Sequence, residues 1–267
     1  AVVWNQFCIR CHSTGGQPRP ASLNETFQTK VGELGIACEA CHGPGEEHIR
    51  LNRQPQRRYA LHGKSDAGDS SIVNPAKLDS KRASMVCGEC HNIKYHEESD
   101  EWLQHGYTYR PGDDLEATTP AMNPADPAKD ELLRKVLAVE PNWLEGSFWS
   151  DGMVRVSGRD YNGMINSACY KKGELSCLSC HSMHHSDPDK QVAARMDTNE
   201  ACFQCHEDFR DRLTEHTRHA ESSSGSLCYN CHMPHTVYGL MKGIRSHWIS
   251  NPSVAFAIIA SGDTAPR

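Results

Sequence analysis

The apolar positions along the chain form short periodic segments separated by polar stretches. Four apolar residues near the middle recur at helical spacing and predict one face of a helix: Leu132, Leu133, Val136 and Leu137. Asp126 and Pro127 favour the start of this helix, with the aspartate as N-cap and the proline at the first helical position. Pro141 ends it.

Two further segments have readable local signals. Residues 148–150 and 153–156 flank Asp151-Gly152, a pair typical of a two-residue hairpin turn. Residues 197–217 are predicted to be helical. Elsewhere Gly, Pro, Ser, Asp and Asn dominate, so the fold class expected is mainly α with long loops and little sheet.

The apolar content is low for a chain of 267 residues. Apolar residues make up 37%, and the mean hydropathy is −0.64. These values leave few apolar side chains to form an ordinary core. The longest apolar run, residues 254–260, is far shorter than the roughly 20 residues that span a bilayer. The sequence therefore predicts no transmembrane segment. The residues around this run, Ser253 to Ala260, are β-prone and uncharged, and burial in the same subunit is expected for them.

The charge pattern argues against binding to nucleic acid. The formal net charge is −6, and no basic stripe runs along the chain. The one dense basic cluster is interpreted as a solvated surface face, and it consists of Arg50, Arg53, Arg57 and Arg58.

Twelve of the thirteen cysteines occur in six copies of Cys-x-x-Cys-His, the attachment signature of c-type haem. Two thiols at this spacing form thioethers with the two vinyl groups of one porphyrin, and the histidine becomes the proximal iron ligand. The predicted thioether residues are Cys8, Cys11, Cys38, Cys41, Cys87, Cys90, Cys177, Cys180, Cys202, Cys205, Cys228 and Cys231. The predicted proximal ligands are His12, His42, His91, His181, His206 and His232.

Other uses of cysteine fit this pattern poorly. A disulfide framework does not require a histidine after every second cysteine, and neither do zinc sites. A thioredoxin-like motif would occur once, within a βαβ unit. The sequence thus predicts six c-type haems with their irons as cofactors. The remaining Cys169 is expected to be a small buried apolar residue.

Six-coordinate haems need a second axial ligand each, and the chain has enough histidines to supply them. Ten histidines lie outside the motifs. The preferred distal candidates are His48, His105, His184, His216, His219, His235 and His247, with His96 as the alternative to His105. Methionine is the rival ligand type, and Met183 and Met233 lie beside motifs, but core packing is the preferred interpretation of both.

The spacing of the motifs indicates a single domain over residues 1–267, organised around a chain of stacked haems. Two three-haem stretches, 1–91 and 177–247, flank a haem-free insert at 92–176, and a C-terminal tail covers 248–267. The insert is expected to cover haem faces, and docking of a partner protein is its alternative role.

Two motifs with their following residues resemble the multihaem c-type cytochromes. The segment from Cys38 to His48, with Gly-Pro-Gly-Glu-Glu after the motif, is similar to one common in tetrahaem to decahaem electron carriers. The segment from Cys228 to His235 is similar to one in carriers related to pentahaem nitrite reductases and octahaem hydroxylamine oxidoreductases. In such proteins the extra histidine is an axial ligand to another haem. The resemblance therefore supports His48 and His235 as distal ligands, and by analogy His184 and His247.

Two functions follow from the residues and the resemblance. The preferred one is electron transfer through mostly bis-His haems, with no catalytic residue. Some six-haem members of the wider class form extracellular conducting filaments, so a filament subunit and a soluble shuttle both remain open. The alternative is a reductase or oxidase of small nitrogen or sulfur compounds with one five-coordinate haem. Its candidate distal donors are Lys94, Tyr107, Tyr109 and Arg110.

Haem attachment also predicts the compartment and the partners. Because this maturation takes place outside the cytoplasmic membrane, the protein is expected to be periplasmic or extracellular. The chain begins at Ala1 without a signal peptide, as expected if a leader has been removed. The expected partners are redox proteins, extracellular acceptors or identical subunits.

Overall fold

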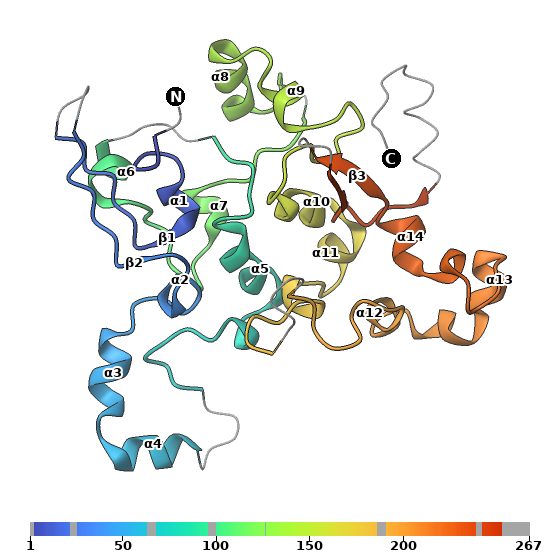
Figure 1. Cartoon of the computed structure of the whole chain (residues 1–267), viewed down its shortest axis with the longest axis horizontal. Helices are drawn as coiled ribbons and strands as arrows, with labels where there is room; N and C mark the ends of the chain where they lie inside the picture. Colours follow the sequence, from blue (N-terminus) through green and yellow to red (C-terminus); the bar gives the residue numbers. More distant parts are fainter. Residues whose placement is uncertain are drawn as a thin grey trace. The chain divides into compact units, whose positions relative to one another are not determined.

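Short helices joined by long irregular segments build the chain in the computed structural model (Figure 1). The structure describes residues 3–21, 26–62, 68–95, 100–125, 127–185, 191–238 and 242–252. Strands are few and short. The prediction of a mainly α protein with long loops and little sheet is therefore confirmed.

The chain divides into two compact units. Unit 1 consists of Ala1–Cys90 and Lys94–Pro120, and unit 2 of His91–Ile93 and Ala121–Arg267. The boundaries fall in and just after the third motif and inside the predicted insert, rather than at the insert's ends. Each unit is described by itself below, and the prediction of a single domain stays a prediction.

Unit 1 contains the first two motifs, the cysteines of the third, and one small sheet. Its β1 and β2 pair in antiparallel fashion, with Ser13 opposite Leu34. The elements are α1 (Ile9–His12), β1 (Ser13–Thr14), β2 (Glu33–Leu34), α2 (Cys38–His42), α3 (Glu46–Asn52), α4 (Pro55–His62), η1 (Pro75–Lys77), α5 (Ser80–Gly88), α6 (Asp100–His105) and α7 (Leu115–Thr118).

Unit 2 contains the last three motifs and ends in an antiparallel pair, β3 and β4, with His235 opposite Arg245. The elements are α8 (Glu131–Val139), α9 (Trp143–Ser147), α10 (Asp160–Asn166), α11 (Ala168–Lys172), η2 (Cys177–Ser179), α12 (Glu200–Phe203), η3 (Glu207–Arg212), α13 (Leu213–Thr217), η4 (Ser224–Ser226), α14 (Cys228–His232), β3 (His235–Tyr238) and β4 (Lys242–Arg245).

The helix predicted around residues 127–140 exists but starts later than expected. Its N-cap is Asp130, whose side chain accepts a hydrogen bond from the Leu133 backbone at 2.9 Å. Asp130 lies about one helical turn after the predicted cap, Asp126. It caps the helix because an N-cap residue stands just before the apolar residues that repeat at helical spacing. Asp126 lies outside the described residues. Leu133 and Val136 are fully buried, as the periodicity predicts.

The other two local predictions are only partly right. In place of one helix over 197–217, the structure has α12, η3 and α13, because the chain leaves the helix after Phe203, within the fifth motif. The predicted hairpin forms its turn at Gly152, which has φ +83°, but pairs only through a bridge between Phe148 and Val154.

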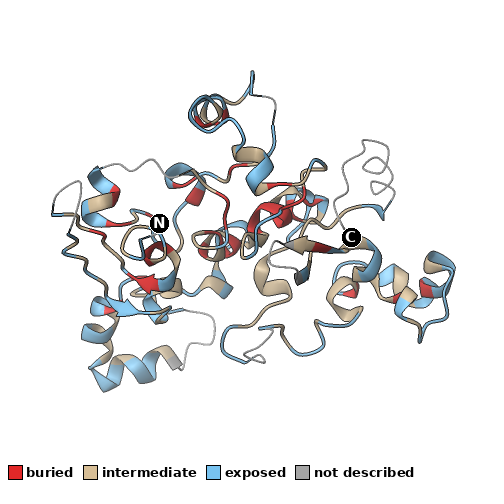
Figure 2. Cartoon of the chain, turned by 45° about the horizontal axis from the view of Figure 1, so that its top comes forward, coloured by how far each residue is buried: buried red, intermediate tan, exposed pale blue. Residues whose placement is uncertain are grey.

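Buried residues occur in short separate stretches, while most of the ribbon is exposed or intermediate (Figure 2). The longest buried stretch lies in α10, where Asn162 is fully buried. Its side chain accepts from the Ile93 backbone at 2.6 Å and donates to the Met122 carbonyl at 2.8 Å. The helix α10 therefore joins two distant segments of unit 2.

The last three motifs lie in a region with almost no side-chain core. Among the described residues from 173 onward, the buried apolar side chains are Phe203 and Leu213. Met183, expected to pack in a core, is 53% exposed because this region offers none. Cys169 is half-buried rather than fully buried. The segment Ser253 to Ala260 lies outside the described residues.

Among the residues that the structure describes, no helix has the length and apolar character needed to cross a lipid bilayer.

Candidate haem sites

Each motif winds into a single helical turn that brings its two cysteines to one face. The second and sixth motifs are helical throughout, as α2 and α14. In three others the histidine backbone donates to the carbonyl of the first cysteine: His12 to Cys8, His181 to Cys177 and His206 to Cys202, each at 2.9 Å. Residues three apart lie on one face of such a turn, so both thiols point to the same side.

The cysteines themselves lie where a large group could cover them. Free cysteine is among the most buried residue types in proteins. Here every motif cysteine is half-buried or exposed, and Cys38, Cys205 and Cys231 are exposed. None of the thirteen forms a disulfide. In the described part of the chain, no three His, Cys, Asp or Glu side chains converge as a bare metal-ion site would require.

Three of the predicted proximal histidines are oriented by backbone carbonyls. The Nδ1 atoms of His42, His181 and His232 lie 2.7, 3.1 and 2.9 Å from the carbonyl oxygens of Val73, Gln191 and Ser250. A carbonyl at Nδ1 fixes the proton there and leaves Nε2 as the lone-pair nitrogen. That is the tautomer an iron ligand needs, so these residues fit a haem.

One distal candidate faces a proximal histidine in the sixth motif. The rings of His216 and His232 have centroids 6.1 Å apart and planes inclined by 7°. Two imidazole nitrogens, each about 2 Å from one metal ion on opposite sides, place the ring centroids about 6 Å apart. The pair therefore has the separation of two axial ligands of one iron.

A second pair has the same separation. The rings of His181, in the fourth motif, and His247 have centroids 6.2 Å apart and planes inclined by 22°. His247 Nδ1 lies 3.1 Å from Asp160 Oδ1 and 3.2 Å from the Arg245 carbonyl. Burial lowers the pKa of His247, but the hydrogen bond to Asp160 and its charge outweigh burial and raise it overall.

The Asp160 carboxylate faces two candidate ligands. Its Oδ2 atom lies 4.0 Å from Nδ1 of His91, the predicted proximal ligand of the third motif. Burial raises the pKa of Asp160, but the hydrogen bond from His247 and the charges of His247 and His91 hold it below its usual value. Nothing in the sequence around Asp160 indicates this role, because both contacts depend on residues at least 69 positions away.

His48, in α3, is held by a polar network in unit 1. Its Nδ1 atom lies 3.1 Å from Asp69 Oδ2 and 3.2 Å from the Asn52 amide. Asp69 also accepts from Ser71 and from Arg57. As in the proximal histidines, this leaves Nε2 available for a metal.

The other predicted distal ligands occupy varied positions, and for them the role stays a prediction. His105 ends α6, and His235 opens β3. The His184 ring meets His185 edge to face at 6.4 Å. His219 packs on Gly225, where an added Cβ would lie 2.6 Å from its ring. His96 lies outside the described residues.

Within unit 1, cysteines of different motifs lie close together. The Cys11 thiol donates to the Cys90 carbonyl across 3.7 Å. Hydrogen bonding with Cys11, together with burial, raises the pKa of the Cys90 thiol. Burial raises the pKa of Cys41, and the charges of Cys87 and Cys38 raise it further. The third motif's cysteines thus lie near those of the first and second motifs.

Within unit 2, the last three motifs are connected in the same way. A hydrogen bond with Cys228 raises the pKa of Cys202, which joins the fifth and sixth motifs. Burial raises the pKa of Cys180, and the charge of Cys205 raises it further, which places the fourth motif near the fifth.

The donors considered for an enzyme site are engaged in contacts inside unit 1. Arg110 donates to the carbonyl oxygens of Tyr107 and Tyr109, both at 2.8 Å. The Lys94 ammonium lies 4.2 Å from the centre of the Tyr107 ring and bonds to the Glu89 carbonyl. Burial raises the pKa of the Tyr107 hydroxyl. These contacts give Lys94, Tyr107 and Arg110 a packing role, and the Tyr109 side chain is buried.

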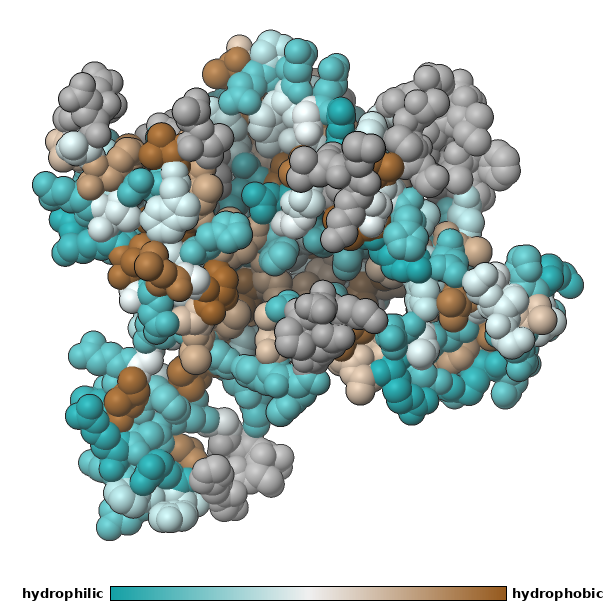
Figure 3. Space-filling view, in the orientation of Figure 1, coloured by the Kyte–Doolittle hydropathy of each residue, from teal (hydrophilic) through white to brown (hydrophobic). Residues whose placement is uncertain are grey.

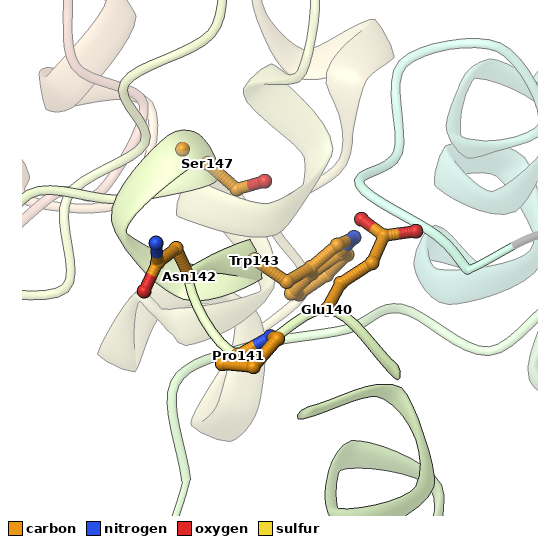
Figure 4. Close-up of a pocket in the computed structure, with 6 residues that line it drawn as sticks. Glu140, Pro141, Asn142, Trp143 and Ser147 are labelled. Atoms are coloured by element: carbon orange, nitrogen blue, oxygen red, sulfur yellow. The ribbon is translucent and has the colours of Figure 1, made fainter. Parts of the chain in front are cut away.

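A hollow of about 500 Å³ lies at the start of α9 (Figure 4). Glu140 and Trp143 lie side by side on one part of its wall. Its lining contains no motif residue and none of the candidate distal ligands or donors, so it is separate from the haem sites. The face of the molecule in Figure 3 is mostly hydrophilic, with hydrophobic residues in small groups.

Two protein-family models match parts of the chain. The model described as "Doubled CXXCH motif" matches residues 168–211, which hold the fourth and fifth motifs. The model described as "Cytochrome c554 and c-prime" matches residues 2–43, which hold the first two motifs.

Among curated proteins, the chain is similar to the multiheme cytochrome MtrA of Shewanella baltica. The two are 24% identical over 218 residues, which cover 78% of this chain and 55% of MtrA. The chain therefore spans about half the length of this relative.

Among solved structures, the chain is similar to the outer cell wall cytochrome OcwA. The TM-score is 0.57 at 21% identity, covering 96% of this chain and 59% of OcwA. An undecaheme cytochrome from the S-layer of Carboxydothermus ferrireducens aligns with a TM-score of 0.38 at 20% identity, covering 93% of this chain and 39% of that one, which is too low to support an argument. The likeness to OcwA shows that the two chains have a similar fold.

Proposed function

We propose that this chain, which is a multihaem c-type cytochrome, transfers electrons through covalently attached haems that each have two histidine ligands. A haem with both axial positions filled by imidazole supplies one-electron redox chemistry. Such a haem would have no coordination position left for a substrate. The chain's own residues would attach the haems, orient them and set their reduction potentials. The six motifs make six the proposed haem number.

The observation that carries the proposal is the pairing of histidine rings. His232 with His216, and His181 with His247, have centroids 6.1 and 6.2 Å apart. In each pair one member belongs to a motif and the other does not. The carbonyl at Nδ1 of His232 or His181 would leave Nε2 as the nitrogen that binds a metal. We assign His216 to the sixth haem and His247 to the fourth.

The proximity of the motifs supports conduction between haems within each unit. In unit 1, Cys90 contacts Cys11, and Cys87 lies near Cys41. In unit 2, the thiols of Cys202 and Cys228 are hydrogen-bonded, and Cys180 lies near Cys205. Each of these residues is an attachment point, so neighbouring cysteines bring neighbouring haems together. Electron tunnelling falls steeply with distance, and such neighbours exchange electrons fastest.

The proposal extends to compartment and partners. c-Type haem is attached outside the cytoplasmic membrane, and one relative is described as an outer cell wall cytochrome. We place this chain in the periplasm or outside the cell, with redox proteins or extracellular acceptors as partners. Assembly with identical subunits into a filament stays a prediction, because the tail that suggested it lies outside the described residues.

Haem count and spin state test this function together. The haem content of the purified protein is measured from the pyridine haemochrome absorbance, and low-temperature electron paramagnetic resonance of the oxidised protein is integrated against it. We expect six haems per chain, all low-spin. A high-spin signal of about one haem per chain would overturn the pure electron-transfer function. It would favour a reductase or oxidase of small nitrogen or sulfur compounds.

A histidine variant tests the assigned pairs. His216→Ala is expected to convert one low-spin haem per chain to high-spin, because the sixth haem loses its second ligand. His185→Ala is the matched control, since this exposed histidine is not among the predicted ligands. Equal spectra for the two variants would remove His216 from the ligand set.

A further inference from the structure

Building on the proposed function, we propose that Asp160 is a positioning residue that lowers the reduction potentials of two haems at once. It would do so by holding one negative charge beside the axial histidines His91 and His247. The sequence separates these three residues widely, and the fold of unit 2 brings them together.

The geometry gives one carboxylate two histidine neighbours. Asp160 Oδ1 lies 3.1 Å from Nδ1 of His247, which is a hydrogen bond. Asp160 Oδ2 lies 4.0 Å from Nδ1 of His91, too far for a hydrogen bond but close enough to place the carboxylate charge beside this histidine. The two oxygens thus face different histidines, and each meets the ring nitrogen that does not bind iron.

Helix α10 fixes Asp160 relative to both histidines. At its start, the Tyr161 backbone donates to the His91 carbonyl at 3.1 Å. Beyond its end, the Ser167 hydroxyl bonds to the His247 carbonyl at 3.3 Å and accepts from the Ile249 backbone at 2.8 Å. Because the helix is attached to both ligand-bearing segments, the carboxylate cannot move away from one histidine without strain.

A carboxylate at Nδ1 changes what the histidine does to its iron. Accepting the Nδ1 proton in a hydrogen bond makes the imidazole a more basic ligand. A more basic ligand, and a fixed negative charge nearby, stabilise the more positive ferric iron over the ferrous one. The predicted proximal histidines of the sixth and second motifs, His232 and His42, face neutral carbonyls instead. Asp160 therefore distinguishes the third and fourth haems from the sixth and second.

The test is the set of reduction potentials of the holoprotein with Asp160→Asn. The amide keeps the shape of the side chain and removes its charge. We expect the equilibrium constants of two one-electron reductions to rise about tenfold, which raises each of the two reduction potentials by about 59 mV. Glu131→Gln removes one charge from an exposed carboxylate that is paired with Lys135 in α8, and it is the matched control. Asp160→Glu keeps the charge and is expected to keep the low potentials.

Two results would overturn the inference. In the first, the reduction potentials shift no more in Asp160→Asn than in Glu131→Gln. In the second, only one reduction potential shifts, which would mean that Asp160 acts on one haem only. Should Asp160→Asn fail to assemble, the near-infrared charge-transfer spectrum of the oxidised wild-type protein decides. We expect bands of carboxylate-bonded histidine ligation at two haems, one through His247 with Asp160 and one through His48 with Asp69, and fewer than two would overturn the inference.

The proposed function fails separately. A high-spin haem in the wild-type protein contradicts bis-His electron transfer whatever Asp160 does. Low-spin haems with unchanged potentials in Asp160→Asn contradict only the role of Asp160.

Discussion

Single polar groups lie at the Nδ1 atoms of five histidines that are predicted to be haem ligands. His42, His181 and His232 are oriented by backbone carbonyls, whereas His48 and His247 face the carboxylates of Asp69 and Asp160. The motif spacing predicts the ligand but not its orienting partner. A backbone carbonyl can come from any residue, so no sequence signal marks Val73, Gln191 or Ser250.

Asp69 gives a prediction about pH at this scale. Burial raises its pKa, but hydrogen bonds from Ser71 and Asn52 and the charge of Arg57 outweigh burial and hold it well below the usual range. The ionised form is therefore favoured in the folded state. Its contribution to stability is fully present above a pH of about 4, the unfolded value, and is lost as the pH falls through the folded pKa.

We expect Asp69→Asn to lower the free energy of unfolding at neutral pH by about 1–3 kcal/mol, since charge-assisted hydrogen bonds are lost. The difference in unfolding free energy between Asp69→Asn and the wild-type protein should become smaller as the pH drops below about 4. Urea unfolding followed by circular dichroism at several pH values measures it. Asp100→Asn, at an exposed position in α6, is the control. A difference that is constant across pH would contradict the role of the Asp69 charge.

Among the elements, the short helix α10 matters more than its length suggests. The Asn162 side chain hydrogen-bonds to the backbone of Ile93 and Met122, and Ser167 beyond the helix end hydrogen-bonds to the His247 carbonyl. Sequence patterning identified α8, whose apolar face is periodic, but not α10. A seven-residue helix whose buried residues include Asn162 and Gly163 has too little apolar periodicity to be seen.

Two helical glycines provide a matched test of this element. A Cβ at Gly163 would lie 2.8 Å from the Trp248 nitrogen and 3.1 Å from the His247 carbonyl carbon. A Cβ at Gly146, in α9, would meet nothing within 4 Å. We expect Gly163→Ala to lower stability by about 1–3 kcal/mol through overpacking. Gly146→Ala should raise it by up to about 1 kcal/mol, because alanine favours the helix.

Thermal unfolding of the two holoproteins measures these changes. The Gly163→Ala protein should also show an altered low-spin signal for one haem, since the His247 backbone must shift. Equal melting temperatures for the two variants would contradict the close approach of α10 to His247.

At the scale of the whole molecule, the haems are expected to supply the interior that side chains do not. Beyond residue 173, Phe203 and Leu213 are the buried apolar side chains in the described part of the chain. Three motifs lie in that same region. A folded segment needs buried apolar area to offset its lost conformational entropy, and here porphyrins would have to provide most of it.

Removing one haem should therefore open this region. The double variant Cys202→Ala, Cys205→Ala is expected to lose one haem and to be cleaved by trypsin within residues 191–238 about tenfold faster, because cleavage follows the population of open chain. Cys169→Ala removes a thiol outside the motifs and is the control. Unchanged cleavage in the double variant would show that the side chains hold this region without its haem.

The sequence by itself determined the chemistry of this protein. Covalent attachment requires two thiols, and proximal ligation requires a histidine at a fixed spacing from them. The motif therefore consists of consecutive residues, such as Cys228 to His232. Low apolar content and abundant loop residues likewise determined a mainly helical, loop-rich fold, since both depend on composition and local propensity.

Only the tertiary structure decided which distant groups meet. The pairing of His216 with His232 and of His181 with His247, and the place of Asp160 between His91 and His247, join positions up to 87 residues apart. Local spacing carries no information about such meetings. They follow from how short helices pack, and α10 shows that a few buried hydrogen bonds are enough to determine them.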